Sequence, residues 1–332
     1  METFSLGNFR LMSGYTLPNA TLAYTTHGTL NAARDNAVLF PNFLAGNDAA
    51  LEMYIGEGMA LDPSRYFIIL PGQFGNGFSS SPSNTPPPFD RGAFPAIAVA
   101  DDVIAQHRLL TEHFGISELQ LVLGWSVGAL QTYEWAVRFP QMVKRMASIA
   151  GAPRPSAWTR LWLQTVIEEP IITDPAWNNG FYADAALVQA GKRRQGHCMA
   201  LTLPPLAYYQ GDLLSRLGFA SADDFARGFF EGFMLPQDPN NILIQARKAR
   251  SADPARGGDM AEALGRITAR ATIVAFTGDV MFPPNDNARD AALIPNARYR
   301  EVSSTSAHLT TFGLFPDDRQ AVEDAIRDAL AA

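Results

Sequence analysis

A pentapeptide near the middle of the chain combines a nucleophile with the small neighbours that its chemistry requires. Residues 124–128 read Gly-Trp-Ser-Val-Gly and match the pattern G-x-S-x-G. In this pattern the serine stands on a strained turn between a strand and a helix, which exposes its hydroxyl. The amide after the serine points to where an oxyanion develops. The apolar run 119–123 predicts the strand and 126–139 the helix, so Ser126 is the predicted nucleophile.

A serine hydroxyl needs a general base to remove its proton, and the base needs an acid to orient it. When the serine occupies such a strand–helix turn, the chain order is serine, then Asp or Glu, then histidine. His308 lies in a loop of small residues after the last predicted strand, where a base can reach over the serine. His197 lies beside the basic run 192–194, which predicts a solvent-exposed face. We therefore expect His308 to be the base.

Three aspartates compete for the role of the orienting acid. Asp279 follows the predicted strand 271–276 and the dipeptide Thr-Gly, which places a carboxylate on a loop at the end of a strand. Asp286 and Asp290 are expected on the next helix, facing solvent. Asp279 is the favoured acid.

An acyl-transfer site also needs donors for the oxyanion, and one comes from the loop after an early strand. Residues 40–46 occupy that place. The backbone N–H groups of Leu44 and Val127 are the predicted pair.

Neither the remaining histidines nor the glycine-rich segment 72–77 has the pattern of a metal or cofactor site, so we expect none. His107 and His113 are six residues apart on one predicted helix and face different sides, and His27 is expected to be structural, in a turn. No Cys/His cluster has the spacing of a zinc site. The segment 72–77 lacks both the G-x-G-x-x-G spacing and a Lys-Ser/Thr ending, which argues against nucleotide binding.

The elements that must position these residues alternate between strands and helices at both ends of the chain. This rhythm predicts an α/β fold in which a mostly parallel sheet is flanked by helices. The middle of the chain looks helical, so we expect a core of residues 1–151 and 266–332 with a helical insertion over 152–265. The predicted strands are 37–40, 67–70, 119–123, 271–276 and 298–302, and the predicted helices are 101–114, 126–139, 161–172, 183–190, 222–233, 240–251 and 320–331.

Composition limits the class of protein. The chain has 332 residues, 47% of them hydrophobic and 18% charged, which is typical of a folded globular protein. Its net charge of −7 disfavours binding to nucleic acids or anionic membranes, which need a positive field. A single cysteine, Cys198, forbids an internal disulfide. The start lacks the pattern of a secretory signal, and no apolar run approaches the roughly 18 residues of a membrane helix, so we expect a soluble cytoplasmic protein.

Taken together, the chain resembles the homoserine O-acetyltransferase family. The resemblance implies an α/β-hydrolase fold, a triad of Ser126, Asp279 and His308, a helical lid and a homodimer formed through that lid. The segments that carry it are 22–31, 36–39, 94–116, 174–180 and 279–284.

Two departures from the family's pattern bear on the substrate. The transferases usually carry an Asp directly after the catalytic histidine, where this chain has Leu309. They also carry an Arg six residues before the Asp-Pro-x-Trp signature, where this chain has Glu168. Leu309 cannot pair with the ammonium of homoserine, and an anion at Glu168 repels the carboxylate that an Arg would hold.

We therefore predict a serine carboxylesterase for small acyl esters, with water as the acceptor of the acyl group. An acetyl-CoA-dependent O-acetyltransferase is the alternative, and a non-enzymatic binding protein is disfavoured by the intact set of Ser, Asp and His. The expected substrate pocket comprises Phe43, Trp125, Glu168, Phe282 and Leu309.

Overall fold

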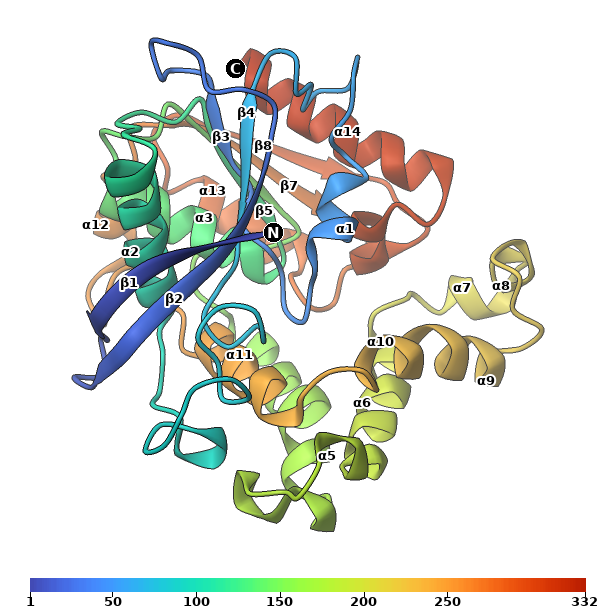
Figure 1. The fold of residues 1–332 in the computed structure, drawn as a ribbon. Helices are drawn as coiled ribbons and strands as arrows, with labels where there is room; N and C mark the ends of the chain where they lie inside the picture. Colours follow the sequence, from blue (N-terminus) through green and yellow to red (C-terminus); the bar gives the residue numbers. More distant parts are fainter.

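The computed structural model describes residues 1–332 and contains one eight-stranded sheet (Figure 1). The strand order is β1-β2-β4-β3-β5-β6-β7-β8. All pairs from β4 to β8 are parallel, whereas β1 and β2 form an antiparallel hairpin at one edge. The predicted α/β architecture is thus confirmed. The strands are β1 (Glu2–Arg10), β2 (Thr16–His27), β3 (Ala37–Leu39), β4 (Phe67–Pro71), β5 (Leu121–Trp125), β6 (Arg145–Ile149), β7 (Arg270–Phe276) and β8 (Ala297–Val302).

Helices cover both faces of the sheet. α2, α3, α12 and α13 lie on one face, and α1 and α14 on the other (Figure 1). No helix is both long and apolar enough to cross a bilayer. These helices are α1 (Asp48–Glu52), α2 (Val99–Arg108), α3 (Val127–Arg138), α12 (Met260–Gly265), α13 (Pro284–Ala291) and α14 (Pro316–Ala331).

The alternation of side chains along the strands divides the core into two layers. Successive residues of a strand point to opposite faces. On β5, Leu121, Leu123 and Trp125 pack toward α1 and α14, whereas Val122 packs toward α2 and α3. The sheet is therefore buried on both faces, as its continuous apolar strands predicted.

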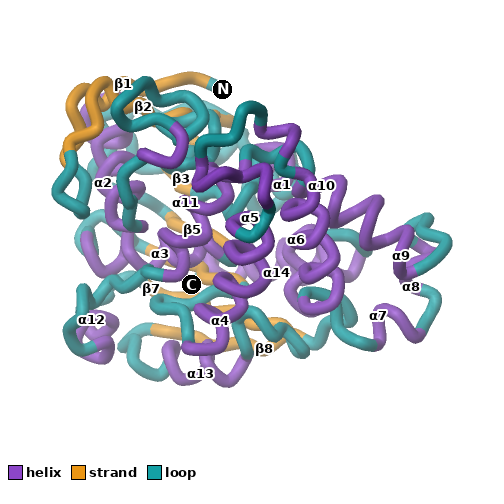
Figure 2. The backbone as a smooth tube through the Cα atoms, turned by 90° about the horizontal axis from the view of Figure 1, so that it is seen from below, coloured by secondary structure: helices purple, strands orange, loops and turns teal.

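Between β6 and β7 the chain forms helices and no strand. Figures 1 and 2 both show α7, α8 and α9 at the far end of an arm that projects from the body. Leu201, near the end of α6, and Leu206, just before α7, are exposed. The homodimer expected through the helical insertion stays a prediction. The helices are α4 (Ala157–Trp162), α5 (Glu169–Ile172), α6 (Gln189–Thr202), α7 (Ala207–Gln210), α8 (Leu213–Arg216), α9 (Ala222–Phe225), α10 (Gly232–Met234) and α11 (Pro239–Arg250); π-helical turns join α4 to α5 (Leu163–Glu168) and α9 to α10 (Ala226–Glu231).

Some local predictions were wrong or incomplete. The hairpin β1–β2 and the strand β6 were not predicted, because their polar and small residues form no apolar run. His27 ends β2 and does not lie in a turn. The helix expected over 183–190 is only a short 3₁₀ turn, Ala185–Leu187, after which α6 begins.

A buried ion pair attaches the insertion to the core. Lys248 on α11 and Asp102 on α2 are both fully buried, with 2.6 Å between Nζ and Oδ2. Lys248 Nζ also donates to the carbonyl of Phe74 at 3.0 Å, and Asp102 Oδ1 accepts from the Phe74 N–H at 2.8 Å. Burial raises the pKa of Asp102 to about 6 and lowers that of Lys248. The pair therefore fixes α11 against the loop that follows β4.

Replacing one partner of this pair should destabilise the fold. Lys248→Met leaves the Asp102 carboxylate buried and uncompensated, which should reduce the free energy of unfolding by about 3–5 kcal/mol. Urea denaturation at neutral pH measures this. Lys144→Met, which breaks an exposed ion pair with Glu118, is the control and should cost less than about 1 kcal/mol. Equal losses in the two variants would contradict the prediction.

Candidate active site

The backbone at Ser126 lies in a region that L-residues rarely adopt. Its φ is 52° and its ψ is −124°, at the junction of β5 and α3. A Cβ on Gly124 would lie 2.4 Å from the backbone of Gly128, and a Cβ on Gly128 would lie 2.6 Å from the carbonyl oxygen of Pro41. The two glycines are therefore required by close backbone approach, and the turn presents the Ser126 hydroxyl at the carboxyl end of the sheet.

Three side chains that are far apart in sequence meet at this turn. His308 Nε2 lies 3.2 Å from Ser126 Oγ, and His308 Nδ1 lies 2.8 Å from Asp279 Oδ2. All three residues are buried. His308 stands on a 3₁₀ turn, Ala307–Phe312, that follows β8. This geometry allows a proton to pass from the serine to the imidazole while the carboxylate holds the opposite ring nitrogen.

The loop after β7 fixes the carboxylate of Asp279. Its Oδ1 accepts hydrogen bonds from the N–H groups of Met281 at 2.8 Å and Phe282 at 3.0 Å, which leaves Oδ2 for His308. The ring of Phe282 stacks on His308, with centroids 5.8 Å apart. The acid and the base are thus held in one relative orientation.

The two rival aspartates contact neither His308 nor Ser126. Both lie on α13, as expected. Asp286 pairs with Arg289. Asp290 is partly buried and does not simply face solvent: it lines a separate cavity of about 380 Å³, and burial raises its pKa to about 7.

The loop after β3 lies against the start of α3, where an oxyanion would form. The N–H of Leu44 donates no hydrogen bond within the chain. Val127 is the first residue of α3, and the amides of a first helical turn have no acceptor within their helix. Leu44 and Ser126 line the same cavity. The two predicted donors are therefore placed beside the serine.

A small apolar cavity of about 40 Å³ adjoins the Ser126 hydroxyl. Phe43 and Trp125 line it, as predicted. The insertion supplies most of the remaining wall. The sequence did not reveal these lining residues, because an apolar residue on a helix looks the same whether it faces a cavity or the core. The residues that were missed are Trp162, Ile167, Met199, Leu203, Phe233, Met281, Thr311 and Phe312.

Three residues predicted for the pocket lie outside this lining. Glu168 is buried and forms ion pairs with Arg250, at 2.6 Å, and Arg247, at 3.3 Å. Leu309 is fully buried in the hydrophobic core. Phe282 packs behind His308 and borders the cavity beside α13. The prediction was wrong for these three because adjacency to a motif does not fix the direction of a side chain.

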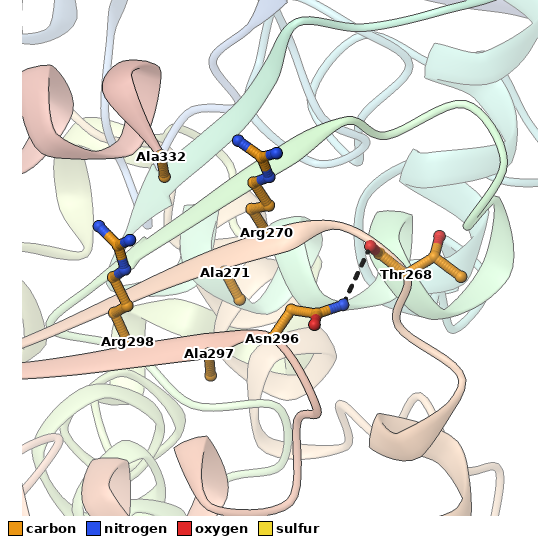
Figure 3. A pocket seen from close by; sticks show the side chains of 7 residues that line it. All are labelled: Thr268, Arg270, Ala271, Asn296, Ala297, Arg298 and Ala332. Atoms are coloured by element: carbon orange, nitrogen blue, oxygen red, sulfur yellow. Dashed lines mark hydrogen bonds between the residues drawn. The ribbon is translucent and has the colours of Figure 1, made fainter.

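A larger cavity lies at the opposite end of the sheet. Figure 3 shows this cavity, of about 440 Å³, at the amino ends of β7 and β8, where Arg270, Arg298 and Asn296 line it. It contains no serine, cysteine, histidine or carboxylate side chain. This cavity therefore offers no side chain for the nucleophilic chemistry that the Ser126 turn provides. No three His, Cys, Asp or Glu side chains are arranged to hold a metal ion.

The basic run on α6 is not uniformly solvated. Lys192 is buried, and its Nζ donates to the carbonyls of Ala185 at 3.2 Å, Leu235 at 2.7 Å and Gln237 at 3.1 Å. Its predicted exposure was wrong, because these carbonyls replace water around the ammonium. His197 is half-exposed and pairs with Glu231.

Comparisons with known proteins agree with this arrangement. Residues 36–312 match the family described as alpha/beta hydrolase fold. The ethyl acetate hydrolase of Pseudomonas veronii is 42% identical over 325 residues, which cover 97% of this chain and 92% of the relative. The homoserine O-acetyltransferase of Trichormus variabilis is 33% identical over 317 residues, covering 90% of this chain and 86% of the relative.

A solved structure shares the fold over its whole length. The acetyl esterase MekB superposes with a TM-score of 0.97 at 41% identity and covers 100% of this chain and 96% of its own. The resemblance noted in the sequence is thereby confirmed, and esterases stand among the relatives alongside transferases.

The raised pKa of Asp290 makes the stability of the fold depend on pH. The folded state retains this proton up to about pH 7, whereas the unfolded chain releases it near the ordinary value of 3.8. The folded state thus binds more protons in this window, so the free energy of unfolding falls as the pH rises through it. Asp290→Asn removes this loss, and its stability gain over the parent protein should be larger at pH 8 than at pH 5.

Urea denaturation at the two pH values measures this difference. Asp286→Asn on the same helix is the control and should shift stability by less than about 1 kcal/mol at either pH. A gain from Asp290→Asn that is identical at both pH values would show that the carboxyl group titrates normally.

Proposed function

Because the chain belongs to the α/β-hydrolase family, within the group that includes homoserine O-acetyltransferases and acetyl esterases, we propose that it is a serine carboxylesterase for short acyl esters. One observation carries this proposal: Ser126, His308 and Asp279 form a continuous hydrogen-bonded array beside an apolar cavity. A relative and a solved structure are named for the hydrolysis of acetyl esters, which agrees with this substrate class.

The geometry gives each residue a defined step. His308 Nε2 takes the proton of Ser126 as Oγ attacks the ester carbonyl carbon, and the electron pair of the C=O bond moves to oxygen. The N–H groups of Leu44 and Val127 hold this oxyanion. The imidazolium then protonates the leaving alcohol, and an acyl-Ser126 ester remains.

The second half of the cycle repeats these steps with water. His308 removes a proton from water, whose oxygen attacks the acyl carbon, and the carboxylic acid leaves as Ser126 regains its proton. Asp279 accepts the Nδ1–H throughout and stabilises the imidazolium without becoming protonated.

The charges around the cavity favour water over homoserine as the acyl acceptor. Apart from His308, the lining contains no ionisable side chain. Homoserine carries an ammonium and a carboxylate, and burying either group without a partner is costly. Leu309 is apolar, and Glu168 is already paired with Arg247 and Arg250. An uncharged ester and water meet no such penalty.

Product analysis distinguishes hydrolysis from acyl transfer. The protein is given p-nitrophenyl acetate or acetyl-CoA, with and without L-homoserine, and acetate and O-acetylhomoserine are counted by mass spectrometry. We expect acetate alone from the ester, in amounts that homoserine does not change. Ser126→Ala and His308→Ala should each lower kcat by at least about a thousandfold. O-acetylhomoserine as the main product would establish the transferase instead.

The volume of the cavity predicts a preference for short acyl groups. The cavity is small, about 40 Å³, so we expect kcat/KM to fall from acetate to butyrate esters of the same alcohol. Met199→Ala opens the wall and should raise the butyrate-to-acetate ratio by about tenfold, since each methylene contributes roughly 1–3 kcal/mol in an apolar pocket.

Met234→Ala is the matched control, because Met234 is buried in the insertion but does not line the cavity. Its butyrate-to-acetate ratio should stay unchanged. If Met199→Ala alters the dependence on alcohol length instead, the cavity holds the leaving group and not the acyl group.

A further inference from the structure

The loop that carries Leu44 has a conformation that its own residues do not favour. Ala45 has a φ of 56°, in the left-handed region that costs a residue with a Cβ about 1–2 kcal/mol. Nothing in the short segment from Phe43 to Gly46 is a regular helix or strand. Within the loop, the Gly46 N–H donates to the carbonyl of Phe43 at 3.1 Å and closes a turn over Leu44 and Ala45. The placement of this turn, and with it the aim of the Leu44 N–H, also depends on groups outside the loop.

Gln73 holds the peptide group to which that N–H belongs. The side chain is fully buried, and its Nε2 donates to the carbonyl of Phe43 at 2.9 Å and approaches that of Asn42 at 3.4 Å. The Phe43 carbonyl and the Leu44 N–H are the two ends of one planar peptide. Fixing the carbonyl thus fixes the N–H, which points the opposite way, and a donor at the carbonyl also polarises that N–H.

The other half of the Gln73 amide has no partner. Its Oε1 is buried and accepts no hydrogen bond. The nitrogen must face the loop, because both of its neighbours there are carbonyl oxygens. A buried, unsatisfied acceptor costs about 1–3 kcal/mol, so an apolar side chain of the same shape would serve packing better. The amide is difficult to explain by stability alone.

Gln245 on α11 holds the next peptide group. Its Oε1 accepts from the Ala45 N–H at 3.1 Å, and its Nε2 donates to the carbonyl of Gly75 at 2.9 Å. One turn further along α11, Lys248 binds the carbonyl of Phe74. Through these hydrogen bonds, α11 of the insertion holds both the loop that carries Leu44, called here the oxyanion loop, and the segment that carries Gln73.

We propose that Gln73 and Gln245 are positioning residues that aim the Leu44 N–H at the oxyanion of the tetrahedral intermediate. The inference rests on the proposed esterase function, in which Leu44 is an oxyanion donor. It assigns a role in the transition state to two side chains that do not touch the substrate. Neither glutamine lines the cavity beside Ser126.

Gln73→Met tests the proposal, because methionine keeps the approximate shape and removes both the donor and the orphaned acceptor. We expect kcat for p-nitrophenyl acetate to fall about 10- to 100-fold, less than the 10²–10³ that follows complete loss of an oxyanion donor. KM should stay within twofold and stability should not fall. A merely structural residue would lose activity and stability together.

A transition-state probe reports on the oxyanion directly. 1,1,1-Trifluoroacetone accepts the Ser126 oxygen at its carbonyl carbon, so that the C=O electron pair becomes an oxyanion and the serine proton passes to His308. Its inhibition constant should rise in Gln73→Met by the factor by which kcat/KM falls. Gln245→Met should show the same correlation, and it serves as the second variant if Gln73→Met does not fold.

Gln131→Met is the matched control. Gln131 is equally buried and donates to the carbonyl of Asn42 at 3.1 Å, but that carbonyl belongs to the peptide before the one that carries the Leu44 N–H. Its kcat should stay within about threefold of the parent, even if its stability falls.

The outcomes separate this inference from the proposed function. Wild-type protein that hydrolyses no ester would overturn both. The positioning role of Gln73 and Gln245 alone would be overturned if the wild type is active and the Gln73→Met and Gln245→Met variants keep kcat within threefold. Loss of activity in these variants without weaker binding of trifluoroacetone would also overturn it.

Discussion

The strained backbone at Ser126 is the constraint on which the rest of the site depends. A left-handed φ at a residue with a side chain persists only when its surroundings over-determine it. Here Gly124, Gly128 and Gly151 allow β5, α3 and the end of β6 to approach closely. A Cβ on Gly151 would lie 2.1 Å from the Cβ of Ala129 and 3.3 Å from the carbonyl oxygen of Ser126. The same approach that exposes the hydroxyl presses α3 against the loop that carries Leu44.

The helical insertion contributes to the site in two ways. Its first helices and α6 form the apolar wall beside Ser126, and its last long helix, α11, contacts the oxyanion loop through Gln245 and the loop after β4 through Lys248. Because Lys248 and Asp102 are buried together, α11 cannot move away without exposing an unpaired charge to an apolar environment. The helical insertion, attached to the core by this ion pair, thus both forms the wall that limits substrate size and supports the oxyanion loop.

The choice of acyl acceptor depends on charge, because the triad serves both reactions. Nothing in the contacts of Ser126, His308 and Asp279 distinguishes water from an alcohol. The difference lies in the cavity lining, which has no ionisable side chain besides His308, while the buried Leu309 and Glu168, which is paired with Arg247 and Arg250, lie outside it. A zwitterionic acceptor would find no counter-charge beside the serine, whereas water needs none.

The sequence alone determined the order and the chemical types of the reacting groups. The strand–turn–helix pattern identified Ser126, and chain order with small-residue loops selected His308 and Asp279, because these signals are local and depend on backbone sterics. Only the tertiary structure decided what surrounds them. Glu168 forms ion pairs with Arg247 and Arg250, and Lys192 donates hydrogen bonds to three carbonyls. Gln73 donates to the carbonyl of Phe43. Most of these partners are distant in sequence. The direction of a side chain depends on packing between elements, and packing leaves no periodic trace along the chain.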